Sequence, residues 1–126
     1  MGDVAVKIAE LCNYSGAGTV EFIMEAPDKF YFMEMNPRIQ VEHPVTEMIT
    51  GIDIIKEQLS IAAGNDLSLK KEDISIHGWS MEARINAENP FSNFLPDIGL
   101  AKELRWPSGA FVRIDSHMRS KLQISK

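Results

Sequence analysis

The sequence predicts an α+β fold with a mostly antiparallel sheet and flanking helices. Two β-rich segments joined by a short turn indicate an antiparallel hairpin near the start of the chain. Helical spacing precedes and follows this hairpin, and further β-rich segments come last; this order is typical of α+β proteins. The chain shows no internal repeat, low-complexity tract or linker, and its 126 residues suit one domain or part of one.

The composition excludes several classes of protein. With 44% hydrophobic and 25% charged residues, the balance is that of a globular protein, and the net charge of −5 argues against a nucleic-acid surface. No apolar run reaches membrane-spanning length, and the N-terminus lacks the features of a signal peptide. The single cysteine, Cys12, rules out an intrachain disulfide and fits a reducing compartment. We therefore expect a soluble, cytoplasmic chain that binds neither nucleic acid nor membrane.

A helix and a hairpin are expected first. Val4, Ile8 and Leu11 recur at helical spacing, which predicts a helix over residues 4–11 that ends in a turn at 13–16. Residues 19–24 and 29–35 are β-rich, and the segment 25–28 between them provides the turn of an antiparallel hairpin.

Two short helices are expected over residues 46–63, separated at Gly51 and ended by Gly64. The apolar residues of the second helix that should form its buried face are Ile54, Ile55, Leu59 and Ala62. Alternation predicts a strand over residues 81–86, and two more strands are expected over 101–106 and 111–115.

The most informative segment is residues 34–44, which groups carboxylates, amides, a guanidinium and an imidazole directly after a predicted strand. Residues two apart on a strand share a face, so Glu34 and Asn36 lie together. Oxygen ligands at this spacing suit Mg²⁺ or Mn²⁺. Arg38, Gln40 and Glu42 repeat the spacing if the segment stays extended. The alternative interpretation is a charged loop after an edge strand.

Glu21 and Glu34 lie on the two strands of the expected hairpin. Because the connection is short, antiparallel pairing can set these two carboxylates side by side on one face of the sheet. Like charges so close are unfavourable unless a cation lies between them, so the pair predicts a metal ion. A solvated pair of surface glutamates is the alternative.

Four segments together resemble a known family. Their sequences are GAGTVEF at residues 16–22, FMEMN at 32–36, RIQVEHPVTE at 38–47 and EARINAENP at 82–90. In this order they resemble the C-terminal half of the ATP-grasp core of biotin carboxylase, the subunit or domain found in acetyl-CoA, propionyl-CoA and pyruvate carboxylases. The resemblance runs through the whole chain, and a chance match of this length is not credible.

The resemblance implies that residues 1–126 are part of a biotin carboxylase domain. Residues 1–75 would be the C-terminal half of the ATP-grasp core, and residues 76–126 the start of the biotin carboxylase C-terminal region. The family's N-terminal domain and its ATP lid would precede residue 1 and be absent. We therefore expect a fragment that is inactive by itself, with function belonging to the parent protein.

The family's reaction joins bicarbonate and ATP to give carboxyphosphate, which breaks down to phosphate and CO₂, and the N1′ nitrogen of biotin captures the CO₂. The resemblance implies that Glu21, Glu34 and Asn36 hold two Mg²⁺ or Mn²⁺ ions. Glu34 would also contribute to the ATP site. Ile23 and Met33, expected to face away from the metal-binding side chains of their strands, would enclose the adenine, although core packing explains these two nearly as well.

The segment after the hairpin would bind bicarbonate. The resemblance makes Glu42 the general base and Arg38 the residue that holds bicarbonate, and a guanidinium suits a planar, carbonate-like anion. Gln40 and the backbone of Val41 would complete the anion pocket. Without the resemblance, Arg38 and Glu42 would be interpreted as a surface ion pair.

Arg84 would pair with the ureido oxygen of biotin as the enolate forms, which is electrostatic stabilisation of developing charge. Without the resemblance it would look like an exposed strand residue beside Glu82. His43 is expected to orient the loop, and His77 and His117 to be structural, because neither has a metal-ligand partner at suitable spacing.

The resemblance also implies partners and leaves alternatives. The partners would be ATP, bicarbonate, a biotin carboxyl carrier protein or domain, a carboxyltransferase, and further copies in a homo-oligomeric parent. Residues 108–111 depart from the family pattern and put its usual homodimer contact in doubt. Another ATP-grasp ligase that uses bicarbonate, such as carbamoyl phosphate synthetase, is one alternative; a non-catalytic assembly fragment is the other. The RIQVEHP string and the context of Arg84 favour biotin.

Overall fold

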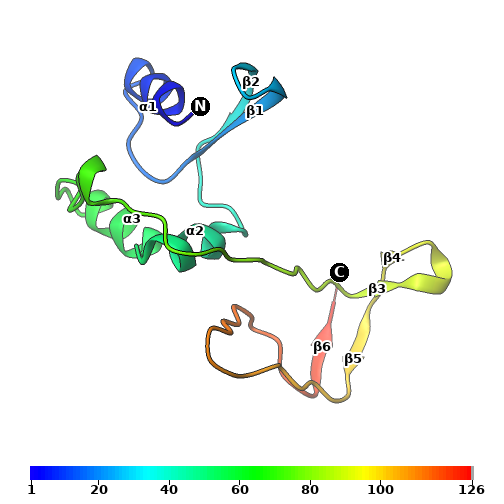
Figure 1. Ribbon diagram of the computed structural model, residues 1–126. Helices are drawn as coiled ribbons and strands as arrows, with labels where there is room; N and C mark the ends of the chain where they lie inside the picture. Colours follow the sequence, from blue (N-terminus) through cyan, green and yellow to red (C-terminus); the bar gives the residue numbers. More distant parts are fainter. Residues whose placement is uncertain (126) are drawn as a thin grey trace. The chain divides into compact units, whose positions relative to one another are not determined.

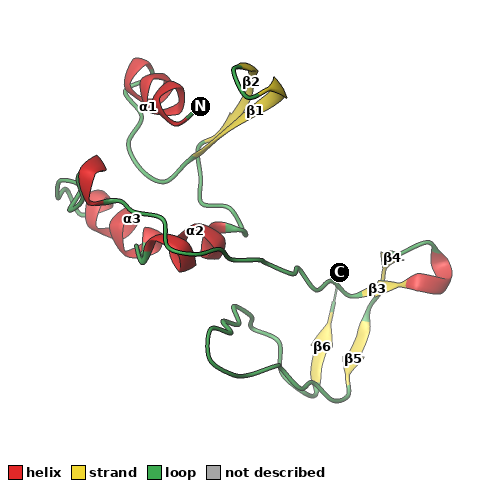
Figure 2. Ribbon diagram, in the orientation of Figure 1, coloured by secondary structure: helices red, strands yellow, loops and turns green. Residues whose placement is uncertain are grey.

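The computed structural model describes residues 1–125, which form helices and three two-stranded antiparallel sheets. The chain divides into two compact units, Met1–Glu82 and Ala83–Lys126, and each is described by itself. The expected α+β class, with antiparallel strands and separate helices, is confirmed (Figures 1 and 2). The strands are distributed over small sheets in place of one continuous sheet.

The first unit opens with helix α1, Gly2–Leu11, where the apolar spacing predicted it. The backbone N–H of Cys12 donates to carbonyls of the last turn and ends the helix. Asn13 follows with a φ of 48°, a left-handed conformation that asparagine tolerates and that turns the chain towards the hairpin.

Strands β1, Thr19–Ala26, and β2, Lys29–Asn36, form the expected hairpin. Phe22 and Phe30 pack edge to face, with ring centroids 5.4 Å apart, and fix the middle of the hairpin. The register shifts on either side of this middle: Glu25 is the extra residue of β1, and Met33 is the extra residue of β2. Because the two bulges lie on opposite strands, they offset each other, and the pairing at the open end of the hairpin returns to the register of the turn.

Helices α2, His43–Thr50, and α3, Ile54–Ala62, confirm the two predicted helices and the break at Gly51. Gly51 ends α2 with a φ of 72°, which glycine adopts without strain. Helix α2 begins earlier than expected because Pro44 fits its first turn, where no backbone N–H is needed. Asp53 caps α3 by accepting a hydrogen bond from the Lys56 N–H at 2.8 Å.

The predicted buried face of α3 is wrong in three of its four residues. Ile54 is partly covered, but Ile55 is 43% exposed, Leu59 is 67% exposed, and Ala62 is exposed too. The covered side instead carries Ile54, Gln58 and Ile61, which line a cavity. Helical periodicity locates an apolar stripe, but the elements that pack against the helix decide which edge of the stripe is covered. Among residues 1–125 no side chain is fully buried.

The second unit holds two small antiparallel sheets. Strand β3, Glu88–Asn89, pairs with β4, Leu95–Pro96, and β5, Gly99–Ala101, pairs with β6, Leu122–Ile124. The short 3-10 helix Pro90–Ser92 connects β3 to β4, and another, Lys71–Asp73, lies in the first unit.

The three strands predicted after residue 80 are not formed as expected. Residues 81–86 have no partner strand within the part of the chain that the structure describes, and a strand requires one for its backbone hydrogen bonds. Of residues 101–106 only Ala101 is in a strand; beyond it, the Leu104 N–H donates to the Ser120 hydroxyl at 2.9 Å, in place of a backbone ladder. At the start of 111–115, Phe111 has a φ of 65°, which a strand excludes.

None of the helices within residues 1–125 is both long enough and apolar enough to cross a membrane.

Candidate active site

Two carboxylates face each other at the open end of the hairpin. Glu21 on β1 is directly opposite Glu34 on β2, so the two carboxylates lie side by side as the sequence predicted. The Asn36 side chain lies between them: its Nδ2 donates to Glu21 Oε1 at 2.8 Å and to Glu34 Oε1 at 3.3 Å. Opposed like charges on neighbouring strands are unfavourable. The amide hydrogens of Asn36 therefore stand where positive charge is needed.

The donor set of this cluster fits a magnesium ion. Mg²⁺ prefers oxygen ligands and is commonly held by one or two carboxylates, with water and substrate phosphates completing its shell. Glu21 and Glu34 supply the carboxylates, and Asn36 can supply Oδ1 if its amide turns over. Within residues 1–125 there is no group of three or more His, Cys, Asp or Glu side chains that could hold a metal by themselves. The amide is therefore the third protein ligand available here.

Arg38 connects this cluster to the segment that follows. Its Nη2 is 3.5 Å from Asn36 Oδ1, its Nη1 donates to the Ile39 carbonyl at 3.3 Å, and its backbone N–H donates to the Asn36 carbonyl at 2.9 Å. The guanidinium is exposed, and only part of its donor capacity is used. It can therefore accept an anion while remaining beside the metal-binding cluster.

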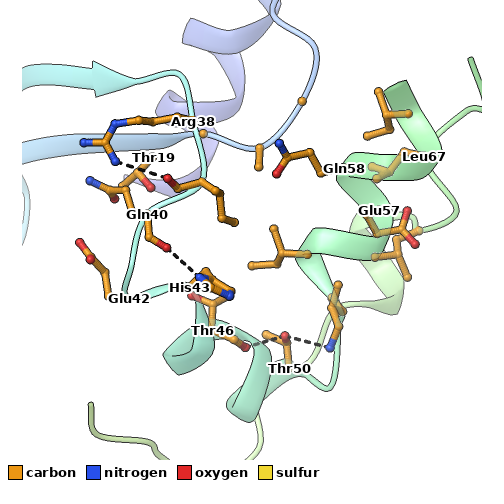
Figure 3. Close-up of a pocket in the computed structure, with 18 of the residues that line it drawn as sticks. Thr19, Arg38, Gln40, Glu42, His43, Thr46, Thr50, Glu57, Gln58 and Leu67 are labelled. Carbon is orange, nitrogen blue, oxygen red and sulfur yellow. Dashed lines mark hydrogen bonds between the residues drawn. The ribbon is translucent and has the colours of Figure 1, made fainter. Parts of the chain in front are cut away.

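Arg38, Gln40 and Glu42 project to the same side of the segment, whereas His43 lies on the other side, towards α2 and α3 (Figure 3). The backbone is not extended as the expectation required, because Arg38 lies in a bend and Val41 and Glu42 lie in a turn that the His43 N–H closes on the Gln40 carbonyl at 3.2 Å. No ion pair joins Arg38 to Glu42 in the part of the chain that the structure describes, so the surface ion-pair alternative is not observed. Glu42 occupies the N-cap position of α2 with its carboxylate exposed, where the helix dipole favours negative charge.

A cavity of about 760 Å³ lies beside this segment, within the first unit. Glu21 is among the residues that line it. Arg38, Gln40 and Glu42 lie at one side of the cavity, and the other side is formed by α3 and the segment after it, where Gln58 and Leu67 lie (Figure 3). The volume and the mixture of an apolar wall with a few convergent polar groups are typical of ligand sites.

His43 contacts the backbone of the segment 37–42 at the Gln40 carbonyl. Its Nδ1 is 2.7 Å from the Gln40 carbonyl, and its backbone N–H donates to the same carbonyl at 3.2 Å. Its Nε2 is buried and has no hydrogen-bond partner among residues 1–125. These contacts agree with the expectation that His43 orients the loop. His77 instead contacts the Ser75 hydroxyl, 2.7 Å from its Nε2.

Ile23 and Met33 were expected on the faces opposite the metal-binding side chains. For Ile23 this expectation is wrong: β1 is unbroken from Glu21 to Ile23, and residues two apart on a strand share a face. Met33 is the bulged residue of β2. Both side chains are open, Ile23 59% and Met33 50% exposed, so they are available to contact a ligand.

Arg84 belongs to the second unit. Its side chain is exposed, and it forms no hydrogen bond or ion pair within residues 1–125. The alternative of an exposed residue in a strand is not observed, because residues 81–86 form no strand in the structure.

Sequence reasoning missed the role of Glu47. This carboxylate on α2 accepts the backbone N–H of Ile54 at 2.7 Å and so holds the N-terminus of α3, which carries part of the cavity wall. The only signal in the sequence was an acidic residue a few positions before a helix start, which is too common to be informative.

Comparison with known proteins first identifies the class. Residues 1–70 match the family model described as carbamoyl-phosphate synthase L chain, ATP binding domain. This match covers more than half of the chain and includes the hairpin, the segment 37–42 and the helices α1, α2 and α3. The class is that of the ATP-grasp ligases.

The second unit and the individual relatives define the family more closely. Residues 82–126 match the biotin carboxylase C-terminal domain model. Biotin carboxylase 1 of Bacillus subtilis is 59% identical over 117 residues, covering 92% of this chain and 26% of that protein. The biotin carboxylase of Haemophilus influenzae is 56% identical over 119 residues, covering 92% of this chain and 26% of that protein. The chain belongs to the biotin carboxylase family, whose members are ATP-dependent ligases.

Solved structures agree with this assignment. The biotin carboxylase domain of a thermophilic 2-oxoglutarate carboxylase, bound to bicarbonate, matches with a TM-score of 0.93 and 48% identity over 98% of this chain and 28% of that chain. The corresponding domain from Hydrogenobacter thermophilus, in complex with MgADP, ADP and bicarbonate, matches with a TM-score of 0.92, 48% identity and 98% coverage of this chain, 27% of that chain. The chain thus spans about a quarter of the length of the relatives it matches.

Proposed function

We propose that this chain supplies the metal-binding and bicarbonate-binding residues, together with a biotin-binding arginine, of an enzyme that carboxylates biotin with ATP and bicarbonate. The observation that carries the proposal is the linkage through Asn36. This side chain bonds both opposed glutamates at one end and lies beside Arg38 at the other. A metal-bound phosphate and an anion held by Arg38 would therefore be neighbours.

The chemistry begins with bicarbonate held by the Arg38 guanidinium, with Gln40 and the Val41 N–H completing the pocket. Glu42 takes the proton of bicarbonate, and the resulting oxygen nucleophile attacks the γ-phosphorus of ATP as ADP leaves. The product, carboxyphosphate, breaks down to CO₂ and phosphate, and the N1′ nitrogen of biotin captures the CO₂. A relative solved with bicarbonate supports the choice of anion.

Glu21, Glu34 and Asn36 would hold Mg²⁺ or Mn²⁺, two ions in the complete site. When bound, the metal neutralises phosphate charge and makes the γ-phosphorus a better electrophile. Ile23 and Met33, both open to solvent, would contact the adenine. The relative from Hydrogenobacter thermophilus was solved with MgADP, which supports this part of the site.

Arg84 would stabilise the enolate that biotin forms as its ureido oxygen gains negative charge. A cation placed where charge develops stabilises the transition state more than the ground state. The support for this role is its place at the start of the segment that matches the biotin carboxylase C-terminal domain, residues 82–126.

The partners proposed are a biotin carboxyl carrier protein or domain, a carboxyltransferase, and further copies in a homo-oligomer. The support is that relatives are named as subunits of larger carboxylases, including one from the mitochondrial methylcrotonoyl-CoA carboxylase of Rattus norvegicus. A cytoplasmic location is also proposed, and the exposed, free thiol of Cys12 is compatible with a reducing compartment. The isolated chain is proposed to be inactive.

Carbamoyl phosphate synthesis is a weaker candidate. The model matched by residues 1–70 carries that name, and the metal and bicarbonate residues would serve either reaction. The match of residues 82–126 to a biotin carboxylase C-terminal domain favours biotin as the acceptor.

The test uses the whole enzyme, meaning a full-length biotin carboxylase that contains these residues. Glu42→Gln should lower bicarbonate-dependent ATP cleavage by roughly 10²–10⁴-fold, the range for a lost general base, while ATP binding is retained. Glu10→Gln, which removes the same charge from an exposed position of α1, is the matched control and should have no effect. Near-normal cleavage in Glu42→Gln would remove this residue from the role of base.

A further inference from the structure

We propose that His43 is a positioning residue for the bicarbonate step, because its imidazole fixes the Gln40–Val41 peptide with the Val41 N–H directed at the anion. The proposal rests on the proposed function and extends it to a side chain that does not itself touch bicarbonate. Three observations support it: two donors on one carbonyl, the trans geometry of the peptide, and the unpartnered second nitrogen of the ring.

The Gln40 carbonyl is held by two donors from one residue. His43 Nδ1 lies 2.7 Å from this oxygen, and the His43 backbone N–H donates to it at 3.2 Å. A carbonyl oxygen only accepts hydrogen bonds, so Nδ1 carries the hydrogen in this contact. The side-chain bond is the shorter of the two. Together with the backbone bond it holds the Gln40 carbonyl in one orientation.

The direction of this carbonyl determines the direction of the next N–H. No cis peptide occurs in residues 1–125, so the C=O of Gln40 and the N–H of Val41 point to opposite sides of one rigid plane. The carbonyl points towards His43, and the Arg38, Gln40 and Glu42 side chains lie on the other side (Figure 3). The Val41 N–H is therefore directed to the side where bicarbonate is proposed to bind.

The Val41 N–H has no acceptor of its own within residues 1–125, and the residue is 57% exposed. It is available to an anion. If the peptide flipped, the carbonyl oxygen would replace the N–H, and a partial negative charge would face bicarbonate. The contact from His43 opposes this flip, so its loss should weaken bicarbonate binding without affecting the nucleotide.

The other ring nitrogen agrees with a hydrogen on Nδ1. Nε2 is buried and lacks a partner in the part of the chain that the structure describes. With the hydrogen on Nδ1, Nε2 is a bare acceptor; with the tautomer reversed, a buried N–H would lack a partner and the bond to Gln40 would be lost. Both consequences are unfavourable, because an unsatisfied buried polar group costs more than a hydrogen bond gains.

Two substitutions separate the roles of the ring nitrogens. In His43→Asn, the amide nitrogen can take the position of Nδ1 and donate to the Gln40 carbonyl; in His43→Gln, it falls near the position of Nε2 instead. In the whole enzyme, His43→Gln should raise the KM for bicarbonate about three- to tenfold, the effect of losing one hydrogen bond, and leave the KM for ATP unchanged. His43→Asn should restore the KM for bicarbonate to within about twofold of the parent value, because it restores the bond.

The outcomes are distinguishable. Unchanged bicarbonate KM in both variants would overturn the proposal, and so would an equal loss of kcat in both with no change in either KM, which indicates general damage to the fold. If His43→Gln does not fold, nitrogen NMR of His43 in the unaltered enzyme decides: hydrogen on Nδ1 supports the proposal, and hydrogen on Nε2 contradicts it. Failure of the proposed function would appear differently, as an unaltered enzyme without bicarbonate-dependent ATP cleavage.

Discussion

Replacing Glu34 by glutamine should weaken metal binding without lowering the stability of the metal-free protein. Glu34 faces Glu21 across the hairpin, and both accept hydrogen bonds from Asn36 Nδ2, at 3.3 and 2.8 Å. Glutamine keeps the size of the side chain and an oxygen that can accept from Asn36, but it removes one negative charge. Only interactions that need that charge should change.

The magnitude follows from Coulomb's law. A divalent ion about 4 Å from a lost unit charge loses about 2 kcal/mol of attraction at the dielectric constant of water, and about four times more at the effective value of 20 used near protein surfaces. Glu34 is exposed, so the figure for water is the minimum, and affinity should fall by at least roughly thirtyfold. In the absence of metal, relief of the repulsion between opposed carboxylates should raise stability by less than about 1 kcal/mol.

The assay is calorimetric titration of the whole enzyme with Mn²⁺ at saturating ADP, combined with denaturant unfolding without metal. Glu25→Gln is the matched control, since it removes a charge from the same hairpin at an exposed ion pair with Lys29. Unchanged Mn²⁺ affinity in Glu34→Gln, or an equal loss in Glu25→Gln, would refute the assignment of the opposed glutamates as metal ligands.

Three further predictions concern the scaffold, and denaturant unfolding measures each. Gly51→Ala should destabilise by about 1 kcal/mol, because the φ of 72° at the end of α2 strains any residue with a Cβ; an unchanged midpoint would contradict this. Glu47→Ala should cost about 1–3 kcal/mol, since it removes the acceptor of the Ile54 N–H at the start of α3, and Glu47→Gln should cost less. The hydrogen bond from Lys71 lowers the pKa of Asp3. The pair therefore stabilises the folded protein fully at pH values above the ordinary pKa of a carboxyl group. This contribution is lost as the pH falls through the lowered pKa. Asp3→Asn should remove this contribution to the loss of unfolding free energy at acid pH. Because the pair is exposed, the effect should be small.

The hairpin was predictable because its signals are local. β-rich segments and a short turn specify an antiparallel pair that can set Glu21 and Glu34 side by side. The exact partner depends on the turn: a turn of residues 25–28 would put Glu21 opposite Phe32, whereas the observed pairing of Ala26 with Lys29 puts it opposite Glu34. The two bulges were not predictable, since one extra residue in each strand leaves no mark on the sequence pattern. Because the bulges lie on opposite strands, they offset each other and leave Glu21 opposite Glu34. The side on which Ile23 lies was predicted wrongly, against the strand period itself.

The prediction of the strands after residue 80 was wrong for a different reason. Residues 81–86 alternate between apolar and polar side chains, as a strand should. The pattern says nothing about a partner strand, and a strand needs one for its backbone hydrogen bonds. The prediction of the buried face of α3 was wrong in the same way, because the elements that pack against the helix decide which of its apolar residues are covered. For the segment 37–42, the side shared by Arg38, Gln40 and Glu42 was predicted, but the extended backbone was not found, because Val41 and Glu42 lie in a turn. The His43 contact that fixes this turn required the structure.

The most direct test of the central claim compares two arginines in two reactions of the whole enzyme. The claim is that Arg38 holds bicarbonate and Arg84 acts only on biotin. Arg84→Ala should retain substantial bicarbonate-dependent ATP hydrolysis without biotin, while carboxylation of free biotin falls by roughly 10²–10³-fold, the range for removing one donor to a developing oxyanion. Arg38→Ala should impair both reactions. If Arg84→Ala also abolishes the hydrolysis while circular dichroism shows an intact fold, the role assigned to Arg84 in biotin chemistry is wrong.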